Sequence, residues 1–373
     1  MCVAWSLLAL VAAACSDGNQ VVAGGKGCEG LEGTELGDAG SCAKTCTTLN
    51  DAFCASDAVE AACPAGNVPT PPVDVCGVLL PLPPDTAGVV DELERSSGVE
   101  EYAGTGAPDL GCYDPSGYPA PPDPSASQAV TLKGVAKIFS HGCESNDLSI
   151  AVHEVVRDGS ANDGMPGDLV GTTVVTATDC KIDGVPEELE DCGTRYECVY
   201  EYPDVPTETE LMVVTGGAIW APIYEYGLYI GNDDVVNGAF EKDVRALAQD
   251  DYQVIAQVAM GKNITPGNGA IAGEVHDCGD VRLVNAIVDV DKPKFVTTYF
   301  TNDEENPLPD LSAKASSTLG LYSALDIAPG PVAVAAAGVL DGKLVSVGFF
   351  RGRIFPDAVS SFTFRGLRPF QVK

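Results

Sequence analysis

One pattern of apolar residues occurs twice in this chain. The first copy contains Leu148, Ala151, Val155 and Tyr200, and the second contains Leu283, Ala286, Val290 and Tyr322. The three apolar residues before each tyrosine have the same spacing in both copies. A pattern that repeats over this length indicates two copies of one structural unit in tandem. The repeat therefore predicts the architecture and leaves the activity open.

The apolar residues of each copy alternate with polar ones. In the segment 130–139, Val130, Leu132, Ala136 and Ile138 share one face, and Thr131, Lys133 and Lys137 share the other. A period of two with one apolar face is typical of a half-buried β-strand. Further strands are expected at residues 149–156, 211–215, 220–230, 273–277, 285–290, 331–337, 344–350 and 359–364. The expected fold class is mainly β.

One helix is expected between the two copies, over residues 240–260. Its apolar residues, together with Asp251, follow roughly helical spacing: Val244, Leu247, Ala248, Asp251, Ile255 and Val258. Gly261 is a suitable end for this helix, and Thr265–Gly269 is rich in turn residues. The first β-unit is therefore placed at 128–238, the helix and joint at 239–269, and the second β-unit at 270–373.

The second copy resembles a known family of domains. The matching residues are Gly273, Val275, Asp277, Leu283, Ala286, Val288, Val290, Gly320, Tyr322, Ile327, Pro329, Gly330, Val332 and Val334. They resemble carboxypeptidase regulatory-like domains, which are small transthyretin-like β-sandwiches of secreted bacterial proteins. The first copy matches at Gly134, Leu148, Ala151, Val155, Tyr200, Val205, Pro206, Leu211 and Val213 and lacks the Pro-Gly pair. The resemblance implies two tandem transthyretin-like β-sandwiches with an auxiliary role, because a fold of this kind does not specify an activity.

The first copy carries an insertion. Ala151 and Tyr200 are 49 residues apart, whereas Ala286 and Tyr322 are 36 apart. The extra residues fall in the region of Cys180 and Cys192, and a disulfide that closes an inserted loop limits its conformational entropy. We therefore expect a Cys180–Cys192 bridge, with Cys143 and Cys198 as competing partners.

The first fourteen residues are an apolar run that ends in small residues, as in a secretory signal peptide. Residues 10–15, LVAAAC, resemble a bacterial lipobox, although Ala12 stands where leucine is usual and no Lys or Arg precedes the apolar run. The resemblance implies cleavage before Cys15 and lipid attachment to that residue. We expect a signal peptide at 1–14, a tether at 15–27 and a lipoprotein of the bacterial outer membrane, bound through its lipid anchor.

Cysteine usage indicates an oxidising compartment. Besides Cys2 and Cys15 the chain has twelve cysteines, an even number. Six of them lie in residues 28–76, which are expected to form a small disulfide-rich helical segment. Residues 77–127 are rich in proline and are expected to be a linker, with Cys112 tied to a neighbouring part of the chain.

The net charge and the absence of several catalytic motifs exclude some classes of function. The net charge of −33 excludes nucleic acid as a partner. No zinc-protease motif, nucleophile elbow, phosphate loop or dinucleotide fingerprint after a strand is present. We therefore expect no enzyme, no cofactor and no metal. Two alternatives stay open: paired His141–Cys143 and His276–Cys278 as metal ligands rather than disulfide positions, and Ca²⁺ binding by the acidic loops Asp158–Gly164 and Thr301–Asp310.

An aromatic cluster is the candidate ligand platform. Trp220, Tyr224, Tyr226 and Tyr229 lie within the expected strand 220–230. Such residues either stack against a sugar or pack within the sheet. The function expected is a non-enzymatic binding or structural module of the cell surface, with an envelope glycan or protein as partner. The alternative is a secreted enzyme or inhibitor that acts on envelope glycans or peptides.

Overall fold

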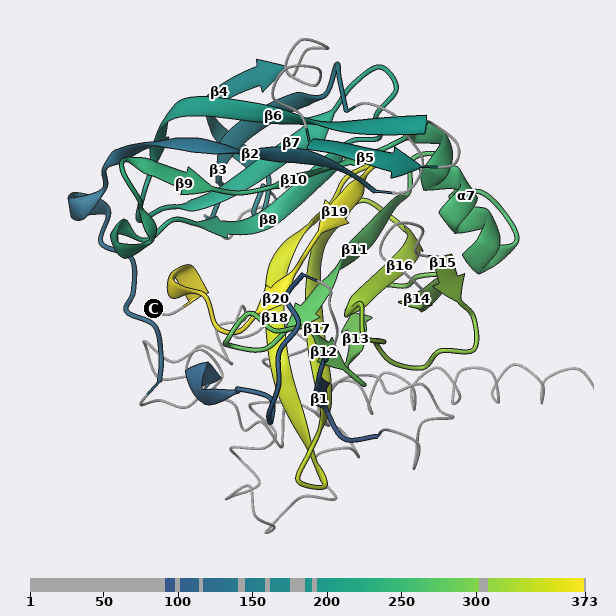
Figure 1. Ribbon diagram of the computed structural model, residues 1–373. Coiled ribbons are helices and arrows are strands. Elements are labelled where there is room, and N and C mark those ends of the chain that lie inside the picture. Colours follow the sequence, from purple (N-terminus) through teal and green to yellow (C-terminus); the bar gives the residue numbers. More distant parts are fainter. Residues whose placement is uncertain are drawn as a thin grey trace, which may run out of the picture.

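The computed structural model describes residues 91–97, 101–113, 117–139, 145–157, 162–174, 185–189, 193–301 and 308–371. The expected signal peptide, the lipid attachment at Cys15 and the disulfide-rich segment lie outside these residues, as does the expected Cys180–Cys192 bridge. The described part is mainly β, with strands arranged in layers and one α-helix (Figure 1).

The first layer lies at the top of Figure 1 and has the strand order β10-β2-β6-β5. Its strands are β2 (Ala129–Phe139), β5 (Val185–Leu189), β6 (Gly193–Pro206), β9 (Ala239–Glu241) and β10 (Val244–Leu247). β9 and β10 both run parallel to β2, and β6 runs antiparallel to it. Because β2 and β6 alternate apolar and polar residues, one face of this sheet is buried against the next layer.

The second layer is a long sheet that runs through both halves, in the order β15-β14-β16-β11-β19-β8-β7-β3-β4. Its strands are β3 (Ser149–Val155), β4 (Pro166–Val174), β7 (Glu210–Gly216), β8 (Ile223–Tyr229), β11 (Gly269–His276), β14 (Val296–Thr301), β15 (Leu308–Asp310), β16 (Leu321–Ile327), β19 (Val359–Ser361) and β20 (Phe364–Arg365), which pairs with β11. Parallel pairing of β19 with both β8 and β11 joins the two halves into one sheet.

A third sheet has the order β13-β17-β18. It is formed by β13 (Ile287–Val290), β17 (Gly330–Leu340) and β18 (Lys343–Ile354), and a small ladder beside it pairs β1 (Glu94–Arg95) with β12 (Leu283–Val284). Short 3₁₀ turns complete the described part at η2 (Gly111–Tyr113), η3 (Pro124–Ala126), η4 (Asn232–Asp234) and η5 (Pro369–Gln371).

The two copies of the sequence pattern share one scheme of strand pairing. In the first, β6 and the later strands β9 and β10 flank β2; in the second, β16 and the later strands β19 and β20 flank β11. Likewise β3 pairs with β7 and β7 with β8, as β13 pairs with β17 and β17 with β18. Tyr200 and Tyr322 therefore lie on equivalent strands, while Ala151 lies within β3 and Ala286 directly precedes β13.

Strands β7 and β8 are buried on both faces because they lie between two hydrophobic cores. Leu211, Val213 and Leu228 belong to the core formed with the first layer. Met212 and Tyr226 belong to the core formed with β17 and β18. Alternate residues of one strand point to opposite faces, so this pair of strands supplies side chains to both cores.

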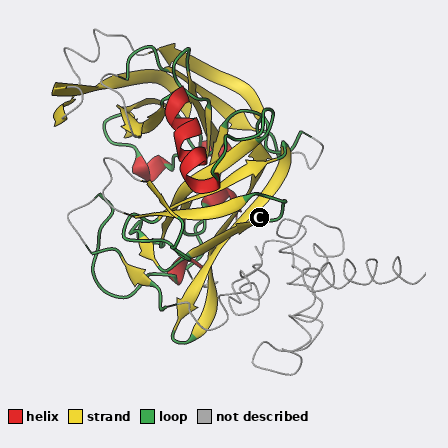
Figure 2. Ribbon diagram, turned by 90° about the vertical axis from the view of Figure 1, so that its right-hand side faces the viewer, coloured by secondary structure: helices red, strands yellow, loops and turns green. Residues whose placement is uncertain are grey.

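The helix is shorter than the sequence pattern indicates, and residues 240–247 are largely strand. α7 (Gln249–Met260) begins only after β10 and ends at Gly261, whose φ of 70° is the left-handed conformation that glycine adopts readily. Val244 and Ala246 are fully buried, which is the period of a strand, and both pair with β2. The apolar residues of this segment fit both periods, and parallel pairing with β2 decides in favour of the strand. α7 lies over the junction of the two halves (Figure 2).

The described residues between 91 and 127 do not behave as a free linker. β1 pairs with β12, and Leu93 is buried against the second half, where it packs on Gly338. Tyr113 is also buried. A disulfide between Cys112 and Cys278, as expected for a cysteine that ties this segment down, fixes it to the end of β11. Two buried side chains, Leu93 and Tyr113, and the disulfide thus hold this proline-rich segment against the second half.

Candidate functional site

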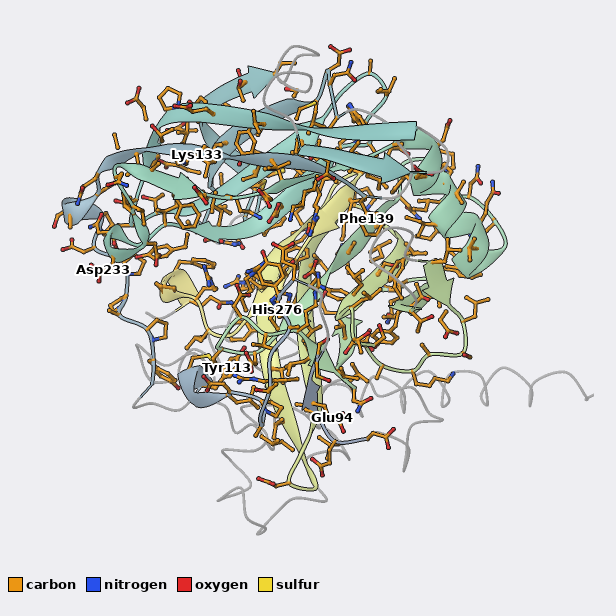
Figure 3. The ribbon with its side chains drawn as sticks, viewed as in Figure 1. Glu94, Tyr113, Lys133, Phe139, Asp233 and His276 are labelled. Atoms are coloured by element: carbon orange, nitrogen blue, oxygen red, sulfur yellow. A yellow bond between two sulfur atoms is a disulfide. The ribbon has the colours of Figure 1, made fainter. Side chains whose placement is uncertain are left out.

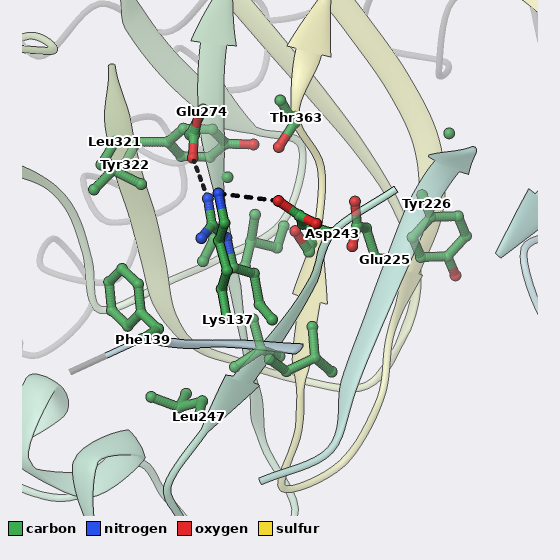
Figure 4. A pocket seen from close by; sticks show the side chains of 18 of the residues that line it. Lys137, Phe139, Glu225, Tyr226, Asp243, Leu247, Glu274, Leu321, Tyr322 and Thr363 are labelled. Atoms are coloured by element: carbon green, nitrogen blue, oxygen red, sulfur yellow. Dashed lines mark ion pairs between the residues drawn. The ribbon is translucent and has the colours of Figure 1, made fainter. Parts of the chain in front are cut away.

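A cavity of about 540 Å³ lies between the two halves. Its walls come from β2, β8, β10 and α7 on one side and from β11, β16, β19 and β20 on the other. Clefts of this size, lined by both apolar and polar groups, are typical of binding sites for small molecules. We call it the interdomain cleft. Figure 4 shows Lys137, Phe139, Glu225 and Thr363 directed toward its interior.

The interdomain cleft concentrates charge of both signs. Its basic residues are Lys137, Lys242, Arg245, Arg282, Arg365 and Arg368, six of the 21 Lys and Arg of the chain. Its acidic residues are Glu101, Glu225, Glu241, Asp243, Glu274 and Asp280. The formal charge of this lining is therefore zero, in a chain whose net charge is −33. A negatively charged molecule therefore meets less repulsion from this lining than the net charge of the chain alone would suggest.

Ion pairs hold most of these basic side chains in place. Lys137 lies 2.8 Å from Glu101 and 3.0 Å from Asp243, the second pair being drawn in Figure 4. Lys242 pairs with Glu225 across the first half. Despite burial, the contacts of Lys137 raise its pKa, and hydrogen bonds from Val135 and Lys137 lower that of Asp243. The polar walls are thus fixed before any ligand enters.

Glu274, which lines the cleft, is the centre of a largely buried network of charged side chains. His276 Nε2 lies 2.7 Å from its carboxylate, Arg282 Nε 3.2 Å and Arg245 3.7 Å. Burial alone would raise the pKa of Glu274, but the hydrogen bond from His276 and the charges of Arg245 and Arg282 outweigh it and hold the pKa well below its usual range. The other ring nitrogen of His276 lies 2.7 Å from Asp280.

His276 itself is completely buried and does not line the cleft. Figure 3 shows it near the centre of the molecule. Both of its nitrogens face carboxylates, and Tyr102 stands beside its ring at 5.0 Å between centroids. A histidine enclosed in this way orients the neighbouring carboxylates and has no open face for a substrate.

Arg368 differs from the other basic residues of the interdomain cleft. Its Nε is buried and has no hydrogen-bond partner in the part of the chain that the structure describes. Burial lowers the pKa of the Arg368 guanidinium, and the nearby charge of Arg365 lowers it further. Arg365, in contrast, is paired with Asp280 at 2.5 Å. Arg368 is a cation with donor capacity left to use.

The end of the cleft beside α7 is apolar. Phe139 and Phe300 meet edge to face with their centroids 6.4 Å apart. Leu247, Ile255 and Leu325 complete this apolar wall. The interdomain cleft therefore combines charged walls with a hydrophobic region, an arrangement suited to an amphipathic ligand.

The expected aromatic platform is not formed, because three of its four residues, Trp220, Tyr226 and Tyr229, are buried. Trp220 is 2% exposed, and its Nε1 donates to the carbonyl of Asn146 at 2.9 Å. Tyr226 is 3% exposed and stacks on Phe362, and it also lines the interdomain cleft. Tyr224 is half-buried and stacks on Phe355 at 3.7 Å. Strand β8, which carries Tyr224 and Tyr226, lies between two hydrophobic cores, and Trp220 just before it belongs to one of these cores.

The cysteine and histidine pairs have other roles where they are described. Cys278 is bonded to Cys112, and Cys198 is also in a disulfide whose partner lies outside the described residues. His141, Cys143, Cys180 and Cys192 lie outside the described residues as well. Within the described ranges, no cluster of His, Cys, Asp and Glu has the arrangement of a metal site.

Sequence reasoning missed the basic residues of the cleft. Arg365 ends β20 and Arg368 follows it, while Arg245 and Arg282 come from segments far apart in the chain. A usable signal was present, since basic residues are scarce in this acidic chain and several of them interrupt apolar strands. The pairing of β19 with both β8 and β11 joins the two halves that carry these segments.

No helix in the described part of the chain has the length and hydrophobicity needed to cross a membrane. No protein-family model matches the chain, and no curated protein matches its sequence. Among solved structures, the chain is similar to a minor pilin of Streptococcus agalactiae at 10% identity, over 63% of this chain and 94% of the pilin chain, with a TM-score of 0.16. Similarity at this level carries no argument about function.

Proposed function

We propose that the protein is a cell-surface lipoprotein that acts as a non-enzymatic binding module, with the interdomain cleft as its binding site. The observation that carries the proposal is the position of this cleft: a charged and partly apolar cavity of about 540 Å³ at the junction of two repeated units. Junctions between domains are common places for ligand sites because neither unit alone has to be hollow.

The repeated unit is proposed to be a transthyretin-like β-sandwich. The shared strand pairing of the two copies supports this reading, as does the equivalent placement of Tyr200 and Tyr322. In this view the two sandwiches are fused through β8 and β19, and the long common sheet holds the two walls of the cleft at a fixed spacing. A fixed spacing favours binding, because less conformational entropy is lost when a ligand enters.

The carboxylates of the cleft support binding better than catalysis. A general acid or base works best with a pKa near the operating pH. The pKa of Glu274 is instead held low by three cationic or hydrogen-bonding neighbours, and that of Asp280, which is only partly buried, is lowered by His276 and Arg365. Both carboxylates are engaged by protein groups. Through their ion pairs, the two carboxylates position arginines around the cavity.

The lipid anchor at Cys15 is the second part of the proposal. It is supported by the LVAAAC context in residues 10–15 and by the acidic, cysteine-containing composition of an exported chain. Outer-membrane attachment would present the interdomain cleft to glycans, peptides or lipids of the envelope. Replacing Cys15 by Ala should release the protein from the membrane fraction and abolish labelling with a fatty-acid analogue. Unchanged fractionation and labelling would refute this part.

The binding role is tested with a variant that fills the cleft. Thr363→Trp places a large ring in the interdomain cleft at a half-buried position. Thr318→Trp is the matched control, because Thr318 is exposed and lies outside the cleft. Purified full-length protein is titrated with fractionated envelope glycans, peptides and lipids, and binding is measured by calorimetry. We expect a fraction that binds the unmodified protein and the Thr318 variant and fails to bind the Thr363 variant. Binding that survives in both variants would contradict the proposal.

A further inference from the structure

The basic residues of the interdomain cleft fall into two groups. Five of them, Lys137, Lys242, Arg245, Arg282 and Arg365, each make an ion pair with a carboxylate. Arg368 makes none within the described residues, and its Nε is buried without a hydrogen bond. Arg368 as a whole is only partly buried, but a buried N–H that has given up water without gaining an acceptor is costly. A ligand that supplies the acceptor removes that cost.

The backbone around Arg368 is held in position before any ligand binds. The Arg368 backbone N–H donates to the side-chain oxygen of Gln371 at 2.8 Å. The side-chain nitrogen of Gln371 donates in turn to the carbonyl of Phe349 at 2.6 Å. These two bonds attach η5 to β18. The guanidinium therefore extends from a fixed anchor, which is what a binding site for an anion requires.

Charge balance decides how much negative charge the cleft accepts. Six basic residues face six acidic ones, so there is no excess positive charge that a dianion would need. Asp280 and Glu274 lie close to the arginines and would repel a second negative charge. The cleft thus fits one negative charge at Arg368. A planar guanidinium matches a carboxylate through two parallel hydrogen bonds.

The same cavity also has an apolar region. Phe139, Leu247 and Phe300 present hydrocarbon surface that a small inorganic anion would leave uncovered. We propose that the interdomain cleft takes an amphipathic carboxylate, whose carboxylate binds Arg368 and whose hydrocarbon part lies against this apolar wall. The inference deepens the binding role proposed above and rests on it.

The test uses octanoate as the probe, with octanol and octyl phosphate as its uncharged and dianionic counterparts. Each is titrated into the full-length protein by calorimetry, below its micelle concentration. We expect octanoate to bind at least about tenfold more tightly than octanol or octyl phosphate, since a charge-assisted pair is made only by the carboxylate without added repulsion. Arg368→Gln should weaken octanoate binding by about tenfold or more and leave octanol binding unchanged. Arg368→Lys should give an intermediate affinity.

Arg351→Gln is the matched control, because Arg351 is half-exposed, faces Asp163 and lies outside the cleft. Its affinity for octanoate should equal that of the unmodified protein. The free Arg368→Gln variant should unfold at the same temperature or a higher one, because it loses a desolvated, unpaired cation. A large drop in its unfolding temperature would show a structural role instead.

The outcomes separate this inference from the proposed function. If octanoate and octanol bind equally and Thr363→Trp abolishes the binding of both, the proposed preference for a carboxylate is wrong and the cleft is still a binding site. If octyl phosphate binds more tightly than octanoate and its binding depends on Arg368, the proposal that the cleft accepts only one negative charge is wrong. Failure of octanoate to bind would overturn the inference outright. Binding of envelope components that Thr363→Trp does not affect would overturn the proposed function itself.

Discussion

Tyr322 lies directly opposite Gly273 in the antiparallel pair of β11 and β16, and its hydroxyl reaches past the glycine to donate to the carbonyl of Phe362 at 2.6 Å. The first half contains the same arrangement: Tyr200 lies opposite Gly134 and donates to the carbonyl of Lys242. In both halves the accepting carbonyl belongs to the chain running parallel on the other side of the glycine strand. The tyrosine thus joins three neighbouring chains, which explains why the glycine and the tyrosine recur together in the sequence.

Gly273→Ala should destabilise the protein strongly. A Cβ at this position would lie 1.9 Å from the Phe362 carbonyl oxygen, so the strands would have to move apart. We expect a loss of about 2 kcal/mol or more in the free energy of unfolding, measured with a chemical denaturant. Gly216→Ala is the control, because its Cβ would meet its nearest neighbour at 3.4 Å, an ordinary contact. Equal effects of the two substitutions would contradict the close approach at Gly273.

Tyr322→Phe should cost about 1–1.5 kcal/mol of unfolding free energy, because the Phe362 carbonyl loses its partner in a buried setting. Tyr113→Phe makes the same chemical change at another buried tyrosine, whose hydroxyl has no hydrogen-bond partner among the described residues. There we expect no loss of stability, or a gain. If both variants lose the same amount of unfolding free energy, the hydrogen bond from Tyr322 to Phe362 makes no specific contribution to stability.

Stability should fall at acid pH, in part through Glu274. Its folded-state pKa lies below the value of about 4.3 expected in the unfolded chain. The stability contributed by the ionised carboxylate is therefore complete above that value and is lost as the pH falls through it toward the folded-state pKa. Glu274→Gln should lower stability at pH 7 and flatten the acid limb between pH 5 and 2, measured by denaturant unfolding at each pH. An acid limb as steep as that of the unmodified protein would contradict this role.

The bridge between Cys112 and Cys278 should stabilise the protein considerably, because it joins residues 166 apart in sequence. Replacing both cysteines by alanine should lower the free energy of unfolding by about 2–5 kcal/mol. Hydrogen exchange should increase in residues 101–113, which the bridge attaches to the second half. Unchanged stability and exchange would mean that Leu93 and Tyr113 hold this segment without help.

The β class, the internal repeat and the helix end at Gly261 could be read from the sequence, because each depends on local spacing. Residues 244–247 could not be assigned correctly, since their apolar positions fit a helix as well as a strand and the choice depends on pairing with the distant β2. Trp220 and Tyr226 were candidates for a surface platform because nothing local shows that β8 and the residues before it are packed between two hydrophobic cores. The interdomain cleft could not be predicted for the same reason, because Arg282, Arg368 and Lys137 line one cavity only when both halves have folded.

Hydrogen exchange with and without bound ligand tests the binding site most directly. The full-length protein is compared alone and with the envelope fraction that raises its unfolding temperature most. We expect protection in the segments that form both walls of the interdomain cleft, residues 242–247 and 363–368. Protection confined to outer surfaces, such as β4 or the exposed face of α7, would contradict a binding site between the two halves.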